Sequence, residues 1–257
     1  ASCLVGSEMC IRDRDNTGPL SLLLSWADKV RKLKIRTNAD TPEDCARALA
    51  FGAEGVGLCR TEHMFFDEKR VHEFRKMILA DNVESRSSYL KNLLPFQTKD
   101  FYKIFKKMDG MPVTVRLLDP PLHEFINIHN KEMKKLADDM GLSLKSVEER
   151  VDTLKEANPM LGHRGCRLGV SYPEITSMQA RAIIGAAAKL KKEGMNPKVE
   201  LMIPLVSNLE EFLNQKNIIL EAKNEIINKS GLKFNLKIGT LIEVPRACRV
   251  AEEIDQE

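Results

Sequence analysis

Short apolar runs alternate with longer amphipathic segments along most of the chain. The runs that predict strands cover 34–39, 54–60, 112–118, 198–204 and 236–244. Apolar positions at helical spacing predict helices over 42–51, 99–108, 175–193 and 209–229, and the charged stretch 123–156 is also expected to be helical. Such alternation, with no hairpin signal, indicates an α/β protein with a parallel sheet, either doubly wound or closed into a barrel.

The ends of several predicted helices carry suitable capping residues. Thr41 and Pro42 supply an N-cap and a first-turn proline, and Ser143 or Ser146 is a candidate cap further on. Glycines follow the expected helix ends at Gly52, Gly194 and Gly231. Pro245 is expected to begin a last helix.

The segment 158–168 is short and rich in glycine, which predicts a strand end and a loop rather than a helix. Counting that segment, the chain has about six β/α units. Three parts are expected: 1–14, 15–33 as a linker helix, and 34–257 as the sheet domain. Residues 1–14 have no periodic pattern and resemble translated adapter sequence, so they are interpreted as a non-native leader or, alternatively, a disordered tail.

The composition narrows the classes of protein that remain. Of 257 residues, 40 are Lys or Arg and 37 are Asp or Glu, and the two signs are interleaved rather than massed, so no nucleic-acid partner is expected. No apolar run reaches the roughly 18–20 residues of a membrane span. The six cysteines contain no C-x-x-C pair, which argues against a zinc knuckle and favours reduced thiols in the cytoplasm.

Charged residues recur at or after the ends of separate predicted strands. They are Arg60, Arg116, Arg164 and Glu243. In a (β/α) barrel such residues converge at one mouth, and three guanidinium groups with one carboxylate there would suit a small, highly anionic ligand together with a metal. Each residue alone could equally be a salt-bridge or helix-cap partner, and Glu243 could pair with Arg246. No G-x-G-x-x-G or P-loop motif follows the first strand, which disfavours a nucleotide-binding open sheet.

Five segments resemble the pyruvate, phosphate dikinase family, and the resemblance runs in register over about 21–257. They are GLCRTEHMFF at 57–66, VRLLDPPLHEF at 115–125, NPMLGHRGCRL at 158–168, MIPL at 202–205 and GTLIEVPR at 239–246. Phosphoenolpyruvate synthase and enzyme I of the sugar phosphotransferase system share the same barrel. The stretch LLDPPLHEF favours the dikinase over enzyme I.

The resemblance implies a TIM-type (β/α)8 barrel that binds phosphoenolpyruvate and pyruvate, of which this chain would supply about six units. It implies phosphoryl transfer between phosphoenolpyruvate and a histidine on another domain of the same parent chain, within the interconversion of ATP, phosphate and pyruvate with AMP, pyrophosphate and phosphoenolpyruvate. By motif match, Arg60 and Arg116 would hold the phosphoryl group, Arg164 would lie nearby, and Glu243 would ligate Mg²⁺. The parent would be a homodimer.

The resemblance also places the phosphorylated histidine and the proton-donating cysteine outside these residues. No catalytic residue is therefore expected within the chain, and the chain alone is expected to be inactive. His63, His123 and His163 are interpreted as structural or supporting, and Cys59, Cys166 and Cys248 as small buried residues. The alternatives are a non-catalytic phosphoenolpyruvate-binding module and the related phosphoenolpyruvate synthase.

Overall fold

One parallel sheet organises the chain in the computed structural model, which describes residues 18–126, 128, 130–155, 158, 160–232 and 235–257. Its strands follow the order β1-β2-β3-β4-β5, and every neighbouring pair is parallel. They are β1 (Thr37–Asn38), β2 (Val56–Arg60), β3 (Pro112–Arg116), β4 (Lys198–Ile203) and β5 (Lys237–Thr240). The predicted α/β class with a parallel sheet is confirmed, whereas closure into a barrel stays a prediction.

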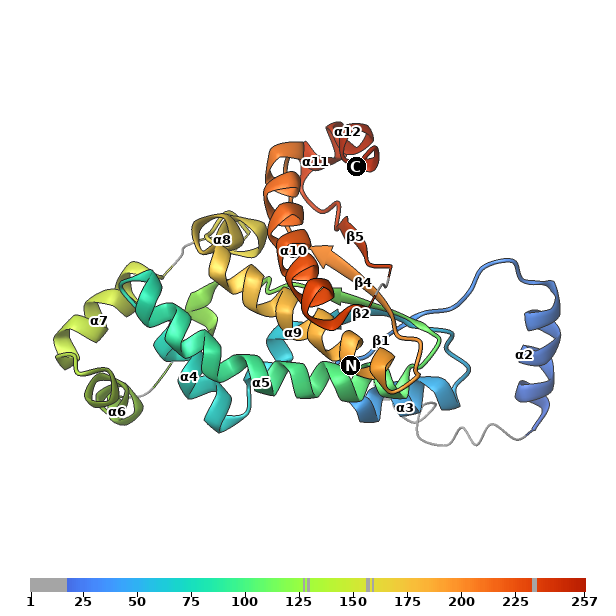
Figure 1. The fold of residues 1–257 in the computed structure, drawn as a ribbon, viewed down its shortest axis with the longest axis horizontal. Helices are drawn as coiled ribbons and strands as arrows, with labels where there is room; N and C mark the ends of the chain where they lie inside the picture. Colours follow the sequence, from blue (N-terminus) through green and yellow to red (C-terminus); the bar gives the residue numbers. More distant parts are fainter. Residues whose placement is uncertain (1–17, 127, 129, 156–157, 159, 233–234) are drawn as a thin grey trace, which may run out of the picture.

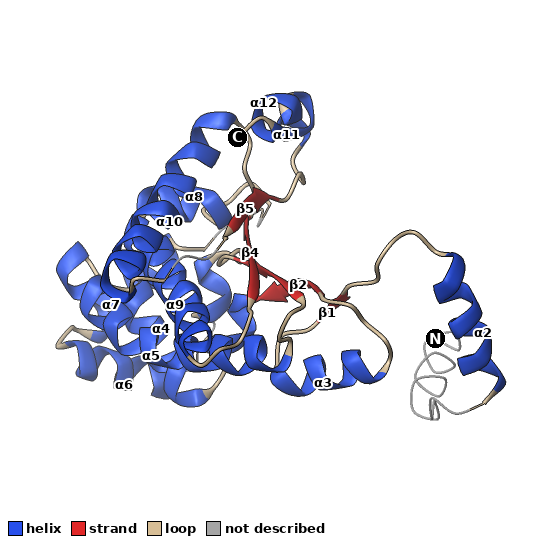
Figure 2. Cartoon of the chain, turned by 45° about the vertical axis from the view of Figure 1, so that its right-hand side comes forward, coloured by secondary structure: helices blue, strands red, loops and turns tan. Residues whose placement is uncertain are grey.

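Helices connect the strands and gather on one side of the sheet (Figures 1 and 2). The α-helices are α2 (Pro19–Val30), α3 (Pro42–Ala50), α4 (Glu68–Ile78), α5 (Val83–Lys107), α6 (Asn130–Met140), α7 (Leu144–Thr153), α8 (Gly165–Ser171), α9 (Pro173–Lys192), α10 (Leu209–Ser230), α11 (Pro245–Arg249) and α12 (Ala251–Asp255). Two 3₁₀ helices, η1 (Thr61–Phe65) and η2 (Leu122–Phe125), follow β2 and β3. Helix α2 lies away from the sheet at the end of an extended segment (Figure 1). No described helix is long and apolar enough to cross a membrane.

The main core lies between the sheet and helices α5, α9 and α10. Val115 of β3 and Leu201 of β4 are buried against Phe101 of α5 and Ile183 of α9. Each of these side chains gains roughly 1.5–3 kcal/mol by leaving water, and the alternating burial along β4 marks the face that is covered. This packing holds the strands, and therefore their carboxyl ends, in place against the helices.

A second core fixes the loops that follow β2 and β3. Phe65 of η1 stacks on Phe74 of α4 with ring centroids 4.2 Å apart, and Phe74 meets Phe125 of η2 edge-on at 4.6 Å. Leu136 of α6 and Val147 of α7 are buried in the same cluster. The two 3₁₀ helices at the carboxyl end of the sheet are therefore held together through one aromatic cluster.

Most predicted helices and their caps are confirmed. The Thr41 side chain accepts a hydrogen bond from the Asp44 backbone N–H, and the Ser143 hydroxyl, not Ser146, caps α7. The glycines predicted at helix ends adopt the left-handed conformation, with φ of 84°, 85° and 70° at Gly52, Gly194 and Gly231. The first and last strands are shorter than predicted, and the interpretation of 1–14 falls outside the described residues.

The prediction for 158–168 is confirmed in part: the described residues up to Arg164 form a loop, but the predicted strand end and the absence of a helix were wrong. Its described residues form no strand, β3 pairs directly with β4, and α8 begins at Gly165. The described residues thus contain five strands rather than about six. Glycine has low helix propensity, yet tertiary packing favours it within α8. A Cβ at Gly169 would lie 2.2 Å from Gln215 Oε1 and 2.6 Å from Thr176 Oγ1, so no larger residue fits there.

A close contact joins the end of β4 to the beginning of α8. Leu205 has φ of 58°, in the left-handed region that side chains disfavour, and Gly165 has φ of 57°. A Cβ on Gly165 would lie 2.9 Å from both Cβ and Cδ1 of Leu205. The Cys166 backbone N–H donates to the Pro204 carbonyl at 3.0 Å, which ties the two segments together.

Gly165→Ala is expected to lower the free energy of unfolding by about 2–3 kcal/mol, because the new methyl combines a clash with an unfavourable φ. Urea denaturation followed by circular dichroism measures this. Gly185→Ala is the matched control, since a Cβ there meets nothing within 4 Å and alanine favours the α9 helix. Equal stability of the two variants would contradict the assigned role of the contact.

Candidate functional site

The strand register brings two of the predicted arginines, Arg60 and Arg116, to one row. Arg60 ends β2 and pairs with Arg116, which ends β3. Arg116 pairs in turn with Met202, and Met202 with Gly239. Paired residues of a parallel ladder project to the same face, so the side chains of Arg60 and Arg116 leave neighbouring strand ends on one side of the sheet.

Arg116 and Arg164 are joined by the carboxylate of Asp119. Arg116 Nη1 lies 3.0 Å from Asp119 Oδ2, and Arg164 Nη2 lies 2.7 Å from the same oxygen. Arg164 Nε also donates to the Asp119 carbonyl at 3.1 Å. Arg116 makes a second ion pair, at 2.5 Å, with Glu62 of η1. Asp119 and Glu62 are only 4% and 6% exposed, so these pairs are strongly shielded from water.

Arg60 is the most accessible of the three arginines. Its side chain is 34% exposed, and its Nη1 lies 3.8 Å from Asp40 Oδ2, a longer contact than those of the other two. Asp40 follows β1 and also accepts the Arg60 backbone N–H at 2.6 Å. His63 Nδ1 lies 2.7 Å from Asp40 Oδ2.

Glu243 lies beyond the end of β5 and contacts the loop after β4. Its Oε1 accepts the Leu205 backbone N–H at 2.8 Å, so its described contact is with this loop rather than with Arg246. Because Leu205 packs on Gly165, Glu243 is linked through this loop to the segment that begins with Arg164. All four predicted site residues therefore lie at or beyond the carboxyl ends of the strands.

Three carboxylates of the site were missed by the sequence analysis. Asp40, Glu62 and Asp119 face the three arginines, so three acids offset the three guanidinium charges. A sequence signal existed, since Glu62 lies two residues after Arg60 and Asp119 three residues after Arg116 within the motifs. The arginines are thus held in place by acids before any ligand binds.

Part of the hydrogen-bonding capacity of this cluster is unused. Glu62 Oε2, Asp119 Oδ1 and Arg116 Nε are buried and have no hydrogen-bond partner among the described residues. Leaving a buried charged atom unpaired is costly, so such atoms usually meet water or a ligand. The arrangement is typical of a polar site rather than of a purely structural ion-pair network.

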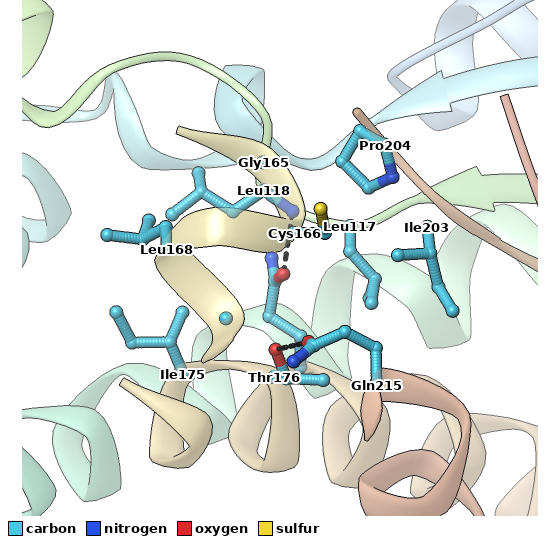
Figure 3. Close-up of a pocket in the computed structure, with 12 residues that line it drawn as sticks. Leu117, Leu118, Gly165, Cys166, Leu168, Ile175, Thr176, Ile203, Pro204 and Gln215 are labelled. Carbon is cyan, nitrogen blue, oxygen red and sulfur yellow. Dashed lines mark hydrogen bonds between the residues drawn. The ribbon is translucent and has the colours of Figure 1, made fainter. Parts of the chain in front are cut away.

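A small cavity lies between the end of β3, the beginning of α8 and helices α9 and α10 (Figure 3). Its volume of about 10 Å³ matches one water molecule. Gln179 lines it and accepts the Leu118 backbone N–H at 2.8 Å, while Gln179 Nε2 has no partner among the described residues. Helix α9 thereby supports the loop between Arg116 and Asp119.

The buried thiols near the site are not suited to nucleophilic chemistry. Burial, with a contribution from Glu211, raises the pKa of Cys166 to about 12, and burial also raises the pKa of Cys59 well above its usual range. Both are small buried residues, as predicted. Cys248 is exposed, so that prediction was wrong for it.

The comparisons with known proteins decide the family. Residues 14–257 match the model of the PEP-utilising enzyme, PEP-binding domain. The chain belongs to this family. Among similar proteins are pyruvate, phosphate dikinase of Clostridium symbiosum, 50% identical over 242 residues, and pyruvate, phosphate dikinase 1, chloroplastic, of Oryza sativa subsp. japonica, 49% identical over 244. The pyruvate, phosphate dikinase of Giardia intestinalis is 49% identical over 240 residues.

These matches cover nearly all of this chain but a small part of each relative. The alignments span 94%, 94% and 93% of the chain, and 28%, 26% and 27% of the relatives. The chain therefore spans about a quarter of the length of the curated relatives that it matches. The predicted resemblance to pyruvate, phosphate dikinase is confirmed.

Asp119→Asn is expected to destabilise this PEP-binding domain by about 3 kcal/mol, because the change leaves Arg116 and Arg164 without their shared buried counter-charge. Urea denaturation measures the change. Asp152→Asn is the control, since Asp152 pairs with Lys155 at 67% and 68% exposure and such surface pairs contribute little. A similar loss in both variants would show that the Asp119 pairs carry no special stability.

Proposed function

We propose that this chain forms the phosphoenolpyruvate-binding part of a pyruvate, phosphate dikinase. The observation that carries the proposal is the row of Arg60 and Arg116 at adjacent strand ends, linked through Asp119 to Arg164. Phosphoenolpyruvate carries a phosphate and a carboxylate on a small frame. Planar guanidinium groups bind both kinds of group through paired hydrogen bonds.

The three arginines are expected to contribute differently to binding, because their ion-pair partners differ. Arg116 and Arg164 are held by buried acids, so their positions are set before the ligand arrives and little ordering is needed on binding. Arg60 is more exposed and less tightly paired, and it would close onto the phosphoryl group as the ligand enters. The phosphoryl group would then move between phosphoenolpyruvate and a histidine on another domain of the parent chain.

Charge neutralisation is the main chemical contribution expected of these residues. When the phosphoryl group leaves, negative charge develops on the enolate oxygen, and fixed cations around the site lower the cost of that charge. The arginines would also hold the phosphorus in line with the incoming histidine. The histidine and the proton-donating cysteine are expected outside these 257 residues, so we expect the chain alone to bind the ligand without completing the reaction.

Glu243 is the proposed magnesium ligand. No group of three or more His, Cys, Asp or Glu side chains that could hold a metal occurs among the described residues. Mg²⁺ commonly uses only one or two protein carboxylates and takes its remaining oxygens from substrate and water, so a single glutamate beyond the end of β5 fits that mode. When bound, Mg²⁺ would stabilise the enolate oxygen.

Arg60→Gln is expected to weaken phosphoenolpyruvate binding roughly tenfold to a hundredfold, because one charge-assisted contact to the phosphoryl group is lost. Isothermal titration calorimetry in excess Mg²⁺ measures the affinity. Arg181→Gln is the matched control, since Arg181 is 47% exposed and pairs with Glu225 on α10. Indistinguishable affinities of the two variants would overturn the proposed role of Arg60.

Removal of the metal tests the role of Glu243. We expect a chelator to weaken phosphoenolpyruvate binding by the unmodified chain and to have little further effect on Glu243→Gln, because that variant already lacks the protein carboxylate. Titrations with and without Mg²⁺ on both proteins measure the two ratios. The assignment fails if Mg²⁺ strengthens binding equally in both.

A further inference from the structure

The carboxylate of Asp40 is shared between Arg60 and His63. One oxygen, Oδ1, accepts the Arg60 backbone N–H at 2.6 Å. The other, Oδ2, lies 2.7 Å from His63 Nδ1 and 3.8 Å from Arg60 Nη1. Asp40 is 14% exposed, so its charge is partly shielded from water, and each of the two cations it can serve competes for the same oxygen.

The contact with Asp40 fixes which nitrogen of His63 carries a proton in the neutral ring. An ionised carboxylate only accepts hydrogen bonds, so Nδ1 is the donor and the neutral ring leaves Nε2 as an acceptor. Protonation of Nε2 gives the ring a positive charge without breaking the bond to Asp40. The His63 side chain is 47% exposed, so it can exchange protons with solvent.

The charge on His63 therefore changes how strongly Asp40 attracts Arg60. With a neutral His63, Arg60 is the one cationic side chain that contacts Oδ2 among the described residues. With a protonated His63 at 2.7 Å, that oxygen is largely neutralised, and the hold of the carboxylate on the Arg60 guanidinium at 3.8 Å weakens. Arg60 then has more of its charge available to an anion.

We propose that His63 is a positioning residue for the site: its protonated ring occupies Asp40 and frees Arg60 to bind the phosphoryl group. This inference rests on the proposed function. His63 acts on the ligand through Asp40 and Arg60, and it neither accepts the phosphoryl group nor holds a metal. The consequence is a site that binds its anionic ligand more tightly as the pH falls through the range in which histidine gains its proton.

The groups around His63 favour this reading. Asp40 faces the ring from the loop after β1, and Arg60 faces Asp40 from the end of β2. The Phe66 ring lies 6.1 Å from the imidazole and carries no charge. Glu62, the acid of η1, is 6% exposed and pairs with Arg116. Among the contacts described for His63, Asp40 is the charged partner through which its protonation reaches the arginines.

The test compares His63→Gln with the unmodified chain. Glutamine keeps a donor near Asp40 but cannot gain a charge. The control is His72→Gln, because His72 Nε2 makes the same type of contact with Asp139 Oδ2, also at 2.7 Å, between α4 and α6. Phosphoenolpyruvate affinity in excess Mg²⁺ is measured by calorimetry from about pH 8 to about pH 5.5, the range of histidine titration.

We expect the affinity of the unmodified chain, relative to that of His63→Gln, to rise roughly fivefold as the pH falls across this range. The control should follow the unmodified chain, which removes the titration of the ligand itself from the comparison. If the ratio of the two affinities does not change with pH, the proposal is overturned. Loss of a purely structural histidine would change the affinity by the same factor at every pH.

A second measurement needs no ligand and separates this proposal from the proposed function. The pH midpoint of the His63 ring is followed by NMR in the unmodified chain and in Arg60→Gln. We expect a higher midpoint in Arg60→Gln, because the competing cation on Asp40 is gone. An unchanged midpoint overturns the shared-carboxylate mechanism even if phosphoenolpyruvate binds. If the midpoint is higher but the chain binds no phosphoenolpyruvate, the coupling of His63 to Arg60 through Asp40 is supported and only the proposed function is rejected.

Discussion

The carboxylate of Asp119 holds together parts of the chain that are far apart in sequence. Its side chain binds Arg116 at the end of β3 and Arg164 at the beginning of α8, and its backbone carbonyl accepts the Gly165 N–H. With the side chain 4% exposed, these contacts form in a medium where an unpaired charge is costly. The geometry of two of the three arginines therefore depends on this one residue.

The same network bears on the proposed anion site, because the charges of its arginines are already offset by acids. Glu62 and Asp119 keep the guanidinium groups of Arg116 and Arg164 in fixed orientations, which reduces the entropy lost on binding. The cost is competition, because a ligand must share the arginines with these acids. Arg60 meets a weaker form of this competition, from Asp40, whose Oδ2 lies 3.8 Å from Arg60 Nη1. The proposed preference for a highly charged ligand would follow from that balance.

The sequence predicted the elements that depend on local patterns and missed those that depend on tertiary contacts. Helix α9 and its glycine end follow directly from apolar spacing, and the strand end at Arg60 follows from a short apolar run. Strand β3 ends at Arg116, two residues before the predicted end at 118. Helix α8 was missed because the segment 158–168 is short and rich in glycine, whereas the lack of a side chain at Gly169 is what lets α8 pack on Gln215. The partner acids lie within the same motifs as the arginines, but which acid pairs with which arginine depends on loop contacts that have no periodic pattern.

The central claim is that the row of Arg60 and Arg116 binds the phosphoryl group of phosphoenolpyruvate. A crystal structure of the chain with phosphoenolpyruvate and Mg²⁺ tests it most directly. The account predicts phosphoryl oxygens within about 3 Å of guanidinium nitrogens of both arginines, with Arg60 displaced from Asp40 toward the ligand. A phosphoryl group bound elsewhere, with the pairs of Arg60 and Arg116 unchanged, would contradict it.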